Sequence, residues 1–278
     1  MIGGRTRLLA LIGQPVEHSL SPRMHNASFV ADGLDYVYVA LDVRPQDLAS
    51  AVRGAAALGF RGFNVTMPHK RTLLPLLDEM DEATRVSGAA NTVVIEEFKL
   101  SGFNTDGGGL VEACQEAGIG IAGQRVVILG AGGVAASVAF AFVGEGAKEM
   151  HIVNRSAAGG RELSGKLRQA KKGIKVQAYP LDALGEAASR ADIIVNATSL
   201  GMKEGDPLPI PVECLDEGRA VCDAVYRPDA ETSLVRLTRE QGARVASGKR
   251  MLLYQGVLAQ KLWTGREPNV KAMDQAIS

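Results

Sequence analysis

The chain has 278 residues, with 31 basic and 31 acidic side chains and a formal net charge of zero. This length suits two domains, the balanced charge argues against nucleic acid as a partner, and no uncharged apolar run reaches the roughly 18 residues of a membrane-spanning helix. The three cysteines have no paired spacing, which argues against a disulfide framework and a zinc site. The first fifteen or so residues lack a secretory pattern. We therefore expect a cytoplasmic protein with no metal, no nucleic-acid partner and no membrane segment.

The first part of the chain alternates between strand and helix signals, which predicts an α/β domain. Ser21 followed by Pro22 is typical of a helix start, with Ser as the N-cap. A further helix is expected to begin at Lys70. The predicted order is strand 8–12, helix 21–31, strand 36–43, helix 45–58, strand 62–67, helix 70–77 and strands 93–96 and 100–103.

Gly107-Gly108-Gly109 is a break in composition, and we place a domain junction there. A helix over 110–117 and a doubly wound pattern with about six strands follow. The strands are expected at 126–129, 149–154, 175–179, 192–196, 220–225 and 243–246, and the helices at 134–143, 159–170, 182–189, 231–241, 249–264 and 270–277. The sequence predicts an N-terminal α/β substrate domain (1–106 plus about 250–278) and a Rossmann domain (107–249), with the C-terminal helices returning to the first domain.

The segment from Arg125 to Ala136 has the spacing G-x-G-x-x-A between a buried strand and a helix. Gly130 permits a tight turn, Gly132 permits close approach of a pyrophosphate, and Ala135 permits close helix–sheet packing. The helix N-terminus then offers amide groups and a positive dipole end to the phosphates. We expect a dinucleotide here, and the alternative is an ordinary glycine-rich turn with no ligand.

The end of the second strand of this domain indicates which dinucleotide is bound. NAD-binding Rossmann domains usually carry an acidic residue there for the ribose 2′-hydroxyl, whereas this chain has Asn154-Arg155-Ser156. A guanidinium suits a 2′-phosphate through forked, charge-assisted hydrogen bonds. NADP is therefore favoured over NAD, and the alternative is a solvated surface arginine at 155.

Lys70 follows a strand end, where ligands sit in open α/β sheets, and there it can exchange a proton with a carbonyl or hydroxyl. Asp106 lies at the domain junction, where an interdomain cleft commonly binds ligand, and a Lys–Asp acid–base pair would form if the two met. The alternatives are a solvated lysine and an Asp acting as helix N-cap. Ser19 and Ser21 offer hydroxyl donors to an anion or serve as turn and capping residues. His151 is expected at the surface.

Taken together, nine ordered motifs resemble the shikimate/quinate dehydrogenase family, from about residue 8 to residue 265. They are G-x-P-x-x-H-S-x-S-P-x-x-H-N at 13–26, N-V-T-x-P-x-K at 64–70, A-x-N-T at 89–92, N-T-D at 104–106, G-A-G-G at 130–133, N-R-S at 154–156, N-A-T-S-x-G-M at 196–202, D-x-V-Y at 223–226 and M-L-L-x-Q-G at 251–256. The resemblance implies reversible NADP-linked reduction of 3-dehydroshikimate to shikimate in aromatic amino acid biosynthesis, by a monomer or homodimer.

The resemblance also implies roles for individual residues. Lys70 is the implied catalytic acid–base, with Asp106 as its partner, and Ser19 and Ser21 are the implied pair for the substrate carboxylate. The implied contacts to the ring hydroxyls are Thr66, Lys70, Asn91, Asp106, Tyr226 and Gln255. The implied cofactor contacts are Gly130, Ala131, Gly132, Gly133 and Val134 for the pyrophosphate, Asn154, Arg155 and Ser156 for the 2′-phosphate, and Val225, Gly248 and Met251 for the nicotinamide half.

Three alternatives remain at this level. One is a relative that acts on quinate, or on quinate and shikimate, with NAD or both cofactors. Another is an aminoshikimate-specific relative, and the third, from a different class, is a non-catalytic sensor domain on the same fold. The Ser19/Ser21 pair and Arg155 favour shikimate and NADP, and the presence of Lys70 and Asp106 argues against a sensor.

Overall fold

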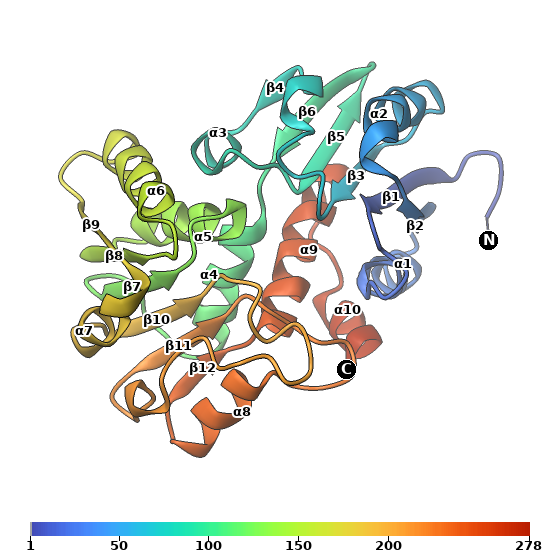
Figure 1. Ribbon diagram of the computed structural model, residues 1–278. Helices are drawn as coiled ribbons and strands as arrows, with labels where there is room; N and C mark the ends of the chain where they lie inside the picture. The colour runs from blue at the N-terminus through green and yellow to red at the C-terminus, as the bar shows by residue number, and fades with distance from the viewer. Residues whose placement is uncertain (1) are drawn as a thin grey trace. The chain divides into compact units, whose positions relative to one another are not determined.

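A computed structural model describes residues 2–278, which form two compact units. The first unit runs to Thr105 and takes in Gln255–Ser278, and the second is Asp106–Tyr254. In Figure 1 the first unit therefore contains the blue-to-cyan strands and the red C-terminal helices, which come from opposite ends of the sequence. Among residues 2–278, no helix is both long and apolar enough to cross a membrane.

The strands of the first unit form one mixed sheet. They are β1 (Arg7–Gly13), β2 (Tyr36–Asp42), β3 (Gly62–Val65), β4 (Glu79–Met80), β5 (Thr92–Glu96) and β6 (Lys99–Phe103). Their order across the sheet is β2-β1-β3-β5-β6-β4. β1 is parallel to both β2 and β3, and β5 is antiparallel to β3 and β6. The parallel part brings the carboxyl ends of β1, β2 and β3 to one edge.

Helices bury both faces of this sheet. They are α1 (Ser21–Ala31), α2 (Leu48–Ala57), α3 (Glu82–Ser87), α10 (Val270–Ile277) and the second half of α9 (Gly248–Thr264), with short 3₁₀ turns at Pro45–Asp47 and Leu74–Leu76. Ala10 and Ile12 of β1 pack in the cluster that contains α2, whereas Leu9 and Leu11 pack with α1 and α9. Figure 1 shows α1 and α2 on opposite sides of β1. Because both faces are covered, β1 is apolar at successive positions.

Gly62 leaves room in this core for Trp263, the one tryptophan of the chain. A β-carbon added at Gly62 of β3 would lie 2.4 Å from the Trp263 indole nitrogen and 2.2 Å from the Val93 carbonyl oxygen. The space left by that missing side chain is where Trp263 Nε1 donates a hydrogen bond to the Val93 oxygen at 2.9 Å. This contact fixes α9 against the sheet.

The second unit is a parallel sheet of the doubly wound type. Its strands are β7 (Arg125–Leu129), β8 (Glu149–Val153), β9 (Lys175–Tyr179), β10 (Ile193–Asn196), β11 (Ala220–Asp223) and β12 (Arg244–Ala246). The order is β12-β11-β10-β7-β8-β9, which is the Rossmann arrangement. The chain reverses its direction of winding between β7 and β10, and such a switch point is where these sheets bind ligands. The predicted two-domain α/β fold class is confirmed.

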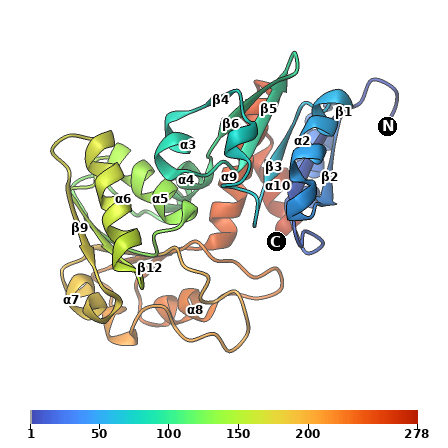
Figure 2. The same cartoon turned by 45° about the horizontal axis from the view of Figure 1, so that its top comes forward.

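The helices of this unit also lie on two sides. α4 (Asp106–Glu116), α5 (Gly133–Gly144) and α6 (Ala157–Ala170) pack in one core cluster, and α7 (Leu184–Ser189) and α8 (Ser233–Glu240) in the other, with 3₁₀ turns at Leu181–Ala183 and Val212–Cys214. Figure 2 shows α5 and α6 on the opposite side of the sheet from α7 and α8. Val126 and Val127 are adjacent in β7 and face opposite clusters.

Two local predictions were wrong and one helix was missed. Residues 70–77 form turns and a short 3₁₀ helix rather than an α-helix, because Pro75 lacks an N–H and disfavours the α conformation at the residue before it. The helix predicted over 110–117 begins at Asp106, so the glycine triplet lies inside α4, and Gly107 leaves room for α5, because a β-carbon there would lie 2.3 Å from the Ser137 carbonyl oxygen. The sequence analysis also missed α3, which Asp81 caps by accepting from the Thr84 amide.

Candidate active site

In the first unit, Thr66 follows β3 directly. Its amide donates to the Ile12 carbonyl oxygen at 2.9 Å, which ties it to the end of β1. Its methyl group lies where a β-carbon on Gly13 would be, at 2.2 Å. Only glycine at position 13 leaves room for Thr66 at this edge of the sheet. The half-buried Thr66 side chain is therefore held at the carboxyl ends of two parallel strands.

Lys70 is positioned by backbone contacts on both sides of its turn. The ring of the preceding residue, His69, is buried, and its Nε2 lies 2.6 Å from the Val43 carbonyl oxygen after β2. The carbonyl oxygen of Lys70 accepts from the Ala90 amide at 2.9 Å. The turn is thus fixed to the β2 end and to the loop before β5, and the Lys70 side chain is half-buried.

Asn91 connects segments that are far apart in the sequence. Its Oδ1 accepts from the Thr105 amide at 2.9 Å, and its Nδ2 donates to Thr105 Oγ1 at 2.9 Å and to Gln255 Oε1 at 3.3 Å. Its carbonyl oxygen accepts from the Val65 amide at 2.8 Å. Gln255 of α9, one of the implied contacts to the ring hydroxyls, therefore meets the loop that carries the A-x-N-T motif.

The Ser19/Ser21 pair lies at the start of α1. Ser19 Oγ accepts from the Ser21 amide at 3.2 Å, which matches the turn role considered for it. The N-cap is Leu20, so the expectation of Ser21 as the cap was wrong, and Ser21 is the first helical residue. The Ser21 side chain does not cap the helix; it lies near the Tyr38 hydroxyl, where it lowers the Tyr38 pKa against the larger effect of burial.

In the second unit, Asp106 is the first residue of α4 and is 5% exposed. Asp106 is therefore not the N-cap of α4, which was the alternative role for it, because the helix includes Asp106 itself. The amide of the next residue, Gly107, donates to Ser137 Oγ of α5 at 2.9 Å. A carboxylate in the first turn is favoured by the helix dipole.

The glycine loop lies at the switch point of the second sheet. Gly130 has φ +110°, and a β-carbon there would lie 2.8 Å from the Ala197 carbonyl oxygen after β10. Gly132 is the N-cap of α5, and the space around its α-carbon is open. Because Gly132 has no side chain to cap the helix, the first-turn amides face a clear approach, and Ala131, Gly133 and Val134 are half-buried beside it.

The loop after β8 adjoins this glycine loop. The Gly130 amide donates to the Val153 oxygen at 2.8 Å, and Ala131 lies 3.6 Å from where a β-carbon of Gly159 would be. Asn154 Nδ2 donates to the Ser156 oxygen at 2.9 Å, and Ser156 Oγ caps α6. Arg155 is exposed at the tip. The structure therefore brings the two predicted cofactor segments to one edge.

The residues assigned to the nicotinamide half also meet. A β-carbon at Gly248 would lie 2.2 Å from the Val225 carbonyl oxygen, so only glycine allows α9 to start there. Val225 and Met251 are buried, and Tyr226 is half-buried. Burial raises the pKa of the Tyr226 hydroxyl, which keeps it a neutral donor.

A buried carboxylate that the sequence analysis gave no role orders the same strand ends. Asp223 accepts from Asn196 Nδ2 at 2.9 Å, from the Val225 amide at 3.1 Å and from Thr232 Oγ1 at 2.6 Å. Burial raises the pKa of this carboxyl group despite those donors. The feature of the sequence that could have identified Asp223 is an acidic residue at the end of an apolar strand, within the D-x-V-Y motif.

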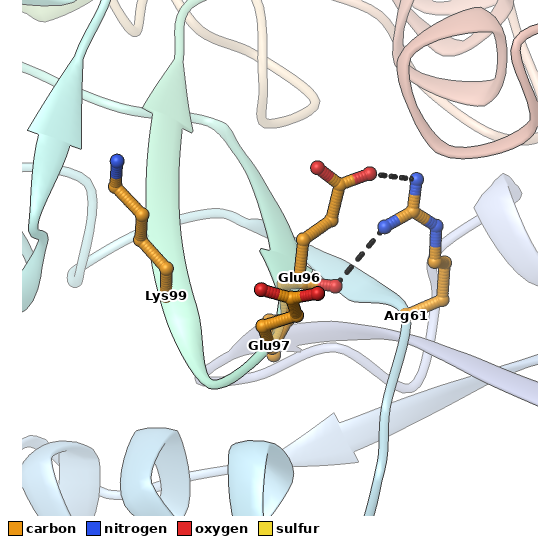
Figure 3. A pocket seen from close by; sticks show the side chains of 5 residues that line it. Arg61, Glu96, Glu97 and Lys99 are labelled. Carbon is orange, nitrogen blue, oxygen red and sulfur yellow. Dashed lines mark hydrogen bonds and ion pairs between the residues drawn. The ribbon is translucent and has the colours of Figure 1, made fainter.

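A surface pocket of about 730 Å³ at the β5–β6 hairpin contains none of the predicted site residues. Figure 3 shows Arg61 directed toward Glu96 within it. Arg61 forms an ion pair with Glu96, with 2.6 Å between the guanidinium nitrogen and the carboxylate oxygen. Lys99 Nζ lies 2.5 Å from a carboxylate oxygen of Glu79. Because these charges are paired within the protein, the pocket offers little to a charged ligand, and the strand-end clusters are the better candidate.

The histidines do not form a metal centre. His151, which we expected at the surface, is 3% exposed in the middle of β8 with its ring 5.2 Å from that of Tyr179, so that prediction was wrong. Helices cover both faces of this sheet, so residues 150–153 of β8 are all buried, His151 among them. Across the described part of the chain, no three His, Cys, Asp or Glu side chains are grouped to hold a metal ion.

Family models match three segments of the chain. The shikimate dehydrogenase substrate binding domain matches residues 11–93, shikimate / quinate 5-dehydrogenase matches 112–202, and the shikimate 5'-dehydrogenase C-terminal domain matches 248–277. The shikimate dehydrogenase (NADP(+)) of Rubrobacter xylanophilus is 56% identical over 278 residues, covering 100% of this chain and 97% of that protein. The chain belongs to the shikimate dehydrogenase family.

Solved structures of this family agree in fold. A shikimate dehydrogenase in complex with NADP+ is 41% identical with a TM-score of 0.90, covering 100% of this chain and 96% of the other. Shikimate 5-dehydrogenase from Listeria monocytogenes, in complex with shikimate and NAD, is 37% identical with a TM-score of 0.91, covering 100% and 98%. The shikimate dehydrogenase family is one of oxidoreductases.

Proposed function

We propose that this chain catalyses the reversible NADP-dependent reduction of 3-dehydroshikimate to shikimate in aromatic amino acid biosynthesis. One observation carries the proposal: full-length similarity, at up to 56% identity, to proteins named shikimate dehydrogenase (NADP(+)). In support, each unit gathers its own set of motif residues at strand ends. We assign substrate binding to residues 1–106 with about 250–278, and NADP binding to 107–249.

For the substrate, we assign the carboxylate to the hydroxyls of Ser19 and Ser21 at the start of α1. The ring hydroxyls are assigned to Thr66, Lys70, Asn91, Asp106, Tyr226 and Gln255. The contact between Asn91 and Gln255 supports this assignment, because two amide groups from distant segments present donors and acceptors together. Such groups suit a small polyhydroxylated ring.

For the cofactor, the loop Gly130–Val134 suits a pyrophosphate. Its support is the open approach at Gly132 and the amide-bearing first turn of α5. Asn154, Arg155 and Ser156 would hold the 2′-phosphate, with the exposed guanidinium of Arg155 as the charged partner. Val225, Gly248 and Met251 would line the nicotinamide half. Bound NADPH would supply the hydride that adds to the substrate carbonyl carbon.

The chemistry that remains for this chain is the movement of one proton. As negative charge grows on the carbonyl oxygen, the Lys70 ammonium stabilises it and gives a proton to that oxygen. In the reverse direction the neutral Lys70 amine accepts the hydroxyl proton. Asp106 is assigned as the acid–base partner of Lys70, as the family motif implies.

The test is an absorbance assay of NADPH and NADH oxidation with 3-dehydroshikimate and with 3-dehydroquinate. The proposal expects turnover with NADPH and 3-dehydroshikimate, and much weaker turnover in the other three combinations. Comparable rates with 3-dehydroquinate or NADH would favour the quinate-type alternative. Absence of turnover in all four, with shikimate still raising the melting temperature, would favour the sensor.

A further inference from the structure

Tyr38 is a hydroxyl-bearing residue that no sequence motif marks. It lies in the middle of β2 and is 1% exposed. Its backbone is held on both sides by the Asn26 side chain, which donates to the Tyr38 oxygen at 2.8 Å and accepts from the Tyr38 amide at 2.9 Å. Its ring is stacked on His25, with centroids 4.5 Å apart and an angle of 23°. The Tyr38 hydroxyl therefore has a fixed position.

That hydroxyl supplies the donor for a buried amide oxygen. Tyr38 donates to Asn64 Oδ1 at 2.7 Å, and Asn64 Nδ2 donates to the Asn91 backbone oxygen at 3.0 Å. A backbone carbonyl can only accept, so the nitrogen of the Asn64 amide must face Asn91 and its oxygen must face Tyr38. The Tyr38 hydroxyl must then be the donor. Burial raises the pKa of Tyr38, so the proton stays on the phenol.

The direction of these bonds continues along one chain. Asn64 Nδ2 also donates to Thr92 Oγ1 at 3.0 Å, and Thr92 Oγ1 donates to Asn91 Oδ1 at 3.0 Å. Since Asn91 Oδ1 accepts, Asn91 Nδ2 is turned toward Gln255 Oε1 at 3.3 Å. Bonds that share direction polarise one another, and a partly satisfied network is costly when buried. We call Tyr38, Asn64, Thr92 and Asn91 the amide relay.

The Tyr38 hydroxyl also lies near a residue that is assigned to the substrate carboxylate. The Ser21 side chain lies near the Tyr38 hydroxyl and lowers the Tyr38 pKa against the larger effect of burial. The Tyr38 hydroxyl thus lies near Ser21, assigned to the substrate carboxylate, and through the amide relay it supports Asn91, assigned to the ring hydroxyls, alongside the Thr105 amide that donates to Asn91 Oδ1 at 2.9 Å.

We propose that Tyr38 is a positioning residue for substrate binding: its hydroxyl hydrogen-bonds Asn64 at the start of the amide relay that supports Asn91, and it lies beside the carboxylate-binding Ser21. This inference rests on the proposed function. It concerns groups that bind the substrate, so its loss should appear in the KM for shikimate and leave that for NADP+ unchanged.

The experiment compares Tyr38→Phe with Tyr36→Phe. Tyr38→Phe keeps the stacked ring and removes the hydroxyl, leaving Asn64 Oδ1 buried without its donor. We expect the KM for shikimate to rise about tenfold, and the KM for NADP+ to stay within about twofold. Tyr36 lies on the same strand with its ring stacked on Phe29, and its hydroxyl accepts from Arg7 outside the amide relay. Tyr36→Phe should leave both constants unchanged.

Variants of Thr92 provide a second test of the inference, which does not depend on the folding of the Tyr38 variant. Thr92→Val breaks the amide relay and should raise the KM for shikimate, whereas Thr92→Ser keeps the hydroxyl and should restore it. The double variant Tyr38→Phe/Thr92→Val should be little worse than either single variant, because both act through one chain of bonds. An unchanged KM in Tyr38→Phe, or Thr92→Ser as impaired as Thr92→Val, overturns the inference. A wild-type protein that does not oxidise shikimate refutes the proposed function instead.

Discussion

The stability of the first unit should fall in acid because of one buried histidine. His25 of α1 is 0% exposed, and its Nδ1 lies 3.0 Å from Gln260 Oε1. Within residues 2–278 its Nε2 is buried with no hydrogen-bond partner. Burial lowers the pKa of His25 from 6.5 to about 4, and the bond to Gln260 opposes this only in part. The folded protein therefore resists protonation here, and the unfolded chain does not.

The size of the effect follows from linkage. At pH values between about 4 and 6.5 the unfolded chain binds one more proton at His25 than the folded chain does, so stability rises with pH across this window. The slope is about 1.4 kcal/mol per pH unit, and the whole window corresponds to about 3 kcal/mol. The contribution is complete above pH 6.5 and is lost as the pH falls to about 4.

The chain provides a local probe for this measurement. Trp263 is its only tryptophan, and its ring meets that of His25 edge-on at 5.4 Å. Urea unfolding followed by tryptophan fluorescence at a series of pH values gives the free energy of unfolding of this region. His25→Gln should be less stable at neutral pH and should have a flatter pH dependence, by about one proton. The exposed His18→Gln is the control and should follow the wild type. Parallel curves for His25→Gln and the wild type would refute the linkage argument.

Three further predictions concern the catalytic lysine, the cofactor and a hairpin. Lys70→Ala should lower kcat by roughly 100- to 10,000-fold with a modest change in shikimate affinity, measured by steady-state kinetics and titration; a loss in binding alone would contradict the acid–base role. Arg155→Ala should raise the KM for NADP+ roughly 10- to 100-fold relative to NAD+. Equal effects on both cofactors, or the same effect from Arg161→Ala, would count against Arg155 as the phosphate contact. Glu97 and Phe98 occupy the β5–β6 turn with φ of 50° and 65°, and Phe98 is 75% exposed. Replacing them with Asn-Gly should raise the free energy of unfolding by about 1 kcal/mol in urea, and a decrease would show that Phe98 contributes packing.

Local chemistry explains where the sequence analysis succeeded. The doubly wound pattern was predictable because the central strands β7 and β10 are apolar runs followed by a glycine or polar turn. The strand ends that carry Thr66 and Asn154 were likewise visible, because a change from apolar to polar residues marks the edge of a parallel sheet. Such signals are contained within a few neighbouring residues and need no knowledge of what packs against them.

Contacts between distant segments explain where it failed. The glycines at 107–109 indicate a break when taken alone, yet they lie in α4, where the close approach of α5 leaves Gly107 no room for a side chain. His151 carries a polar ring, yet it is buried because helices cover both faces of the sheet at β8. Tyr38 resembles any aromatic strand residue, and its importance comes from Asn64 and Ser21, which the fold brings to its hydroxyl.

By itself, then, the sequence determined the fold class, the family and the candidate residues, because these depend on residue types, spacing and the order of motifs along the chain. The tertiary structure alone decided which hydroxyl, amide and backbone groups meet, because hydrogen bonds depend on positions in space that spacing in the sequence does not encode. The amide relay is the clearest case. Its members come from β2, β3 and the start of β5, and only the pairing of those strands in one sheet gives the relay a direction.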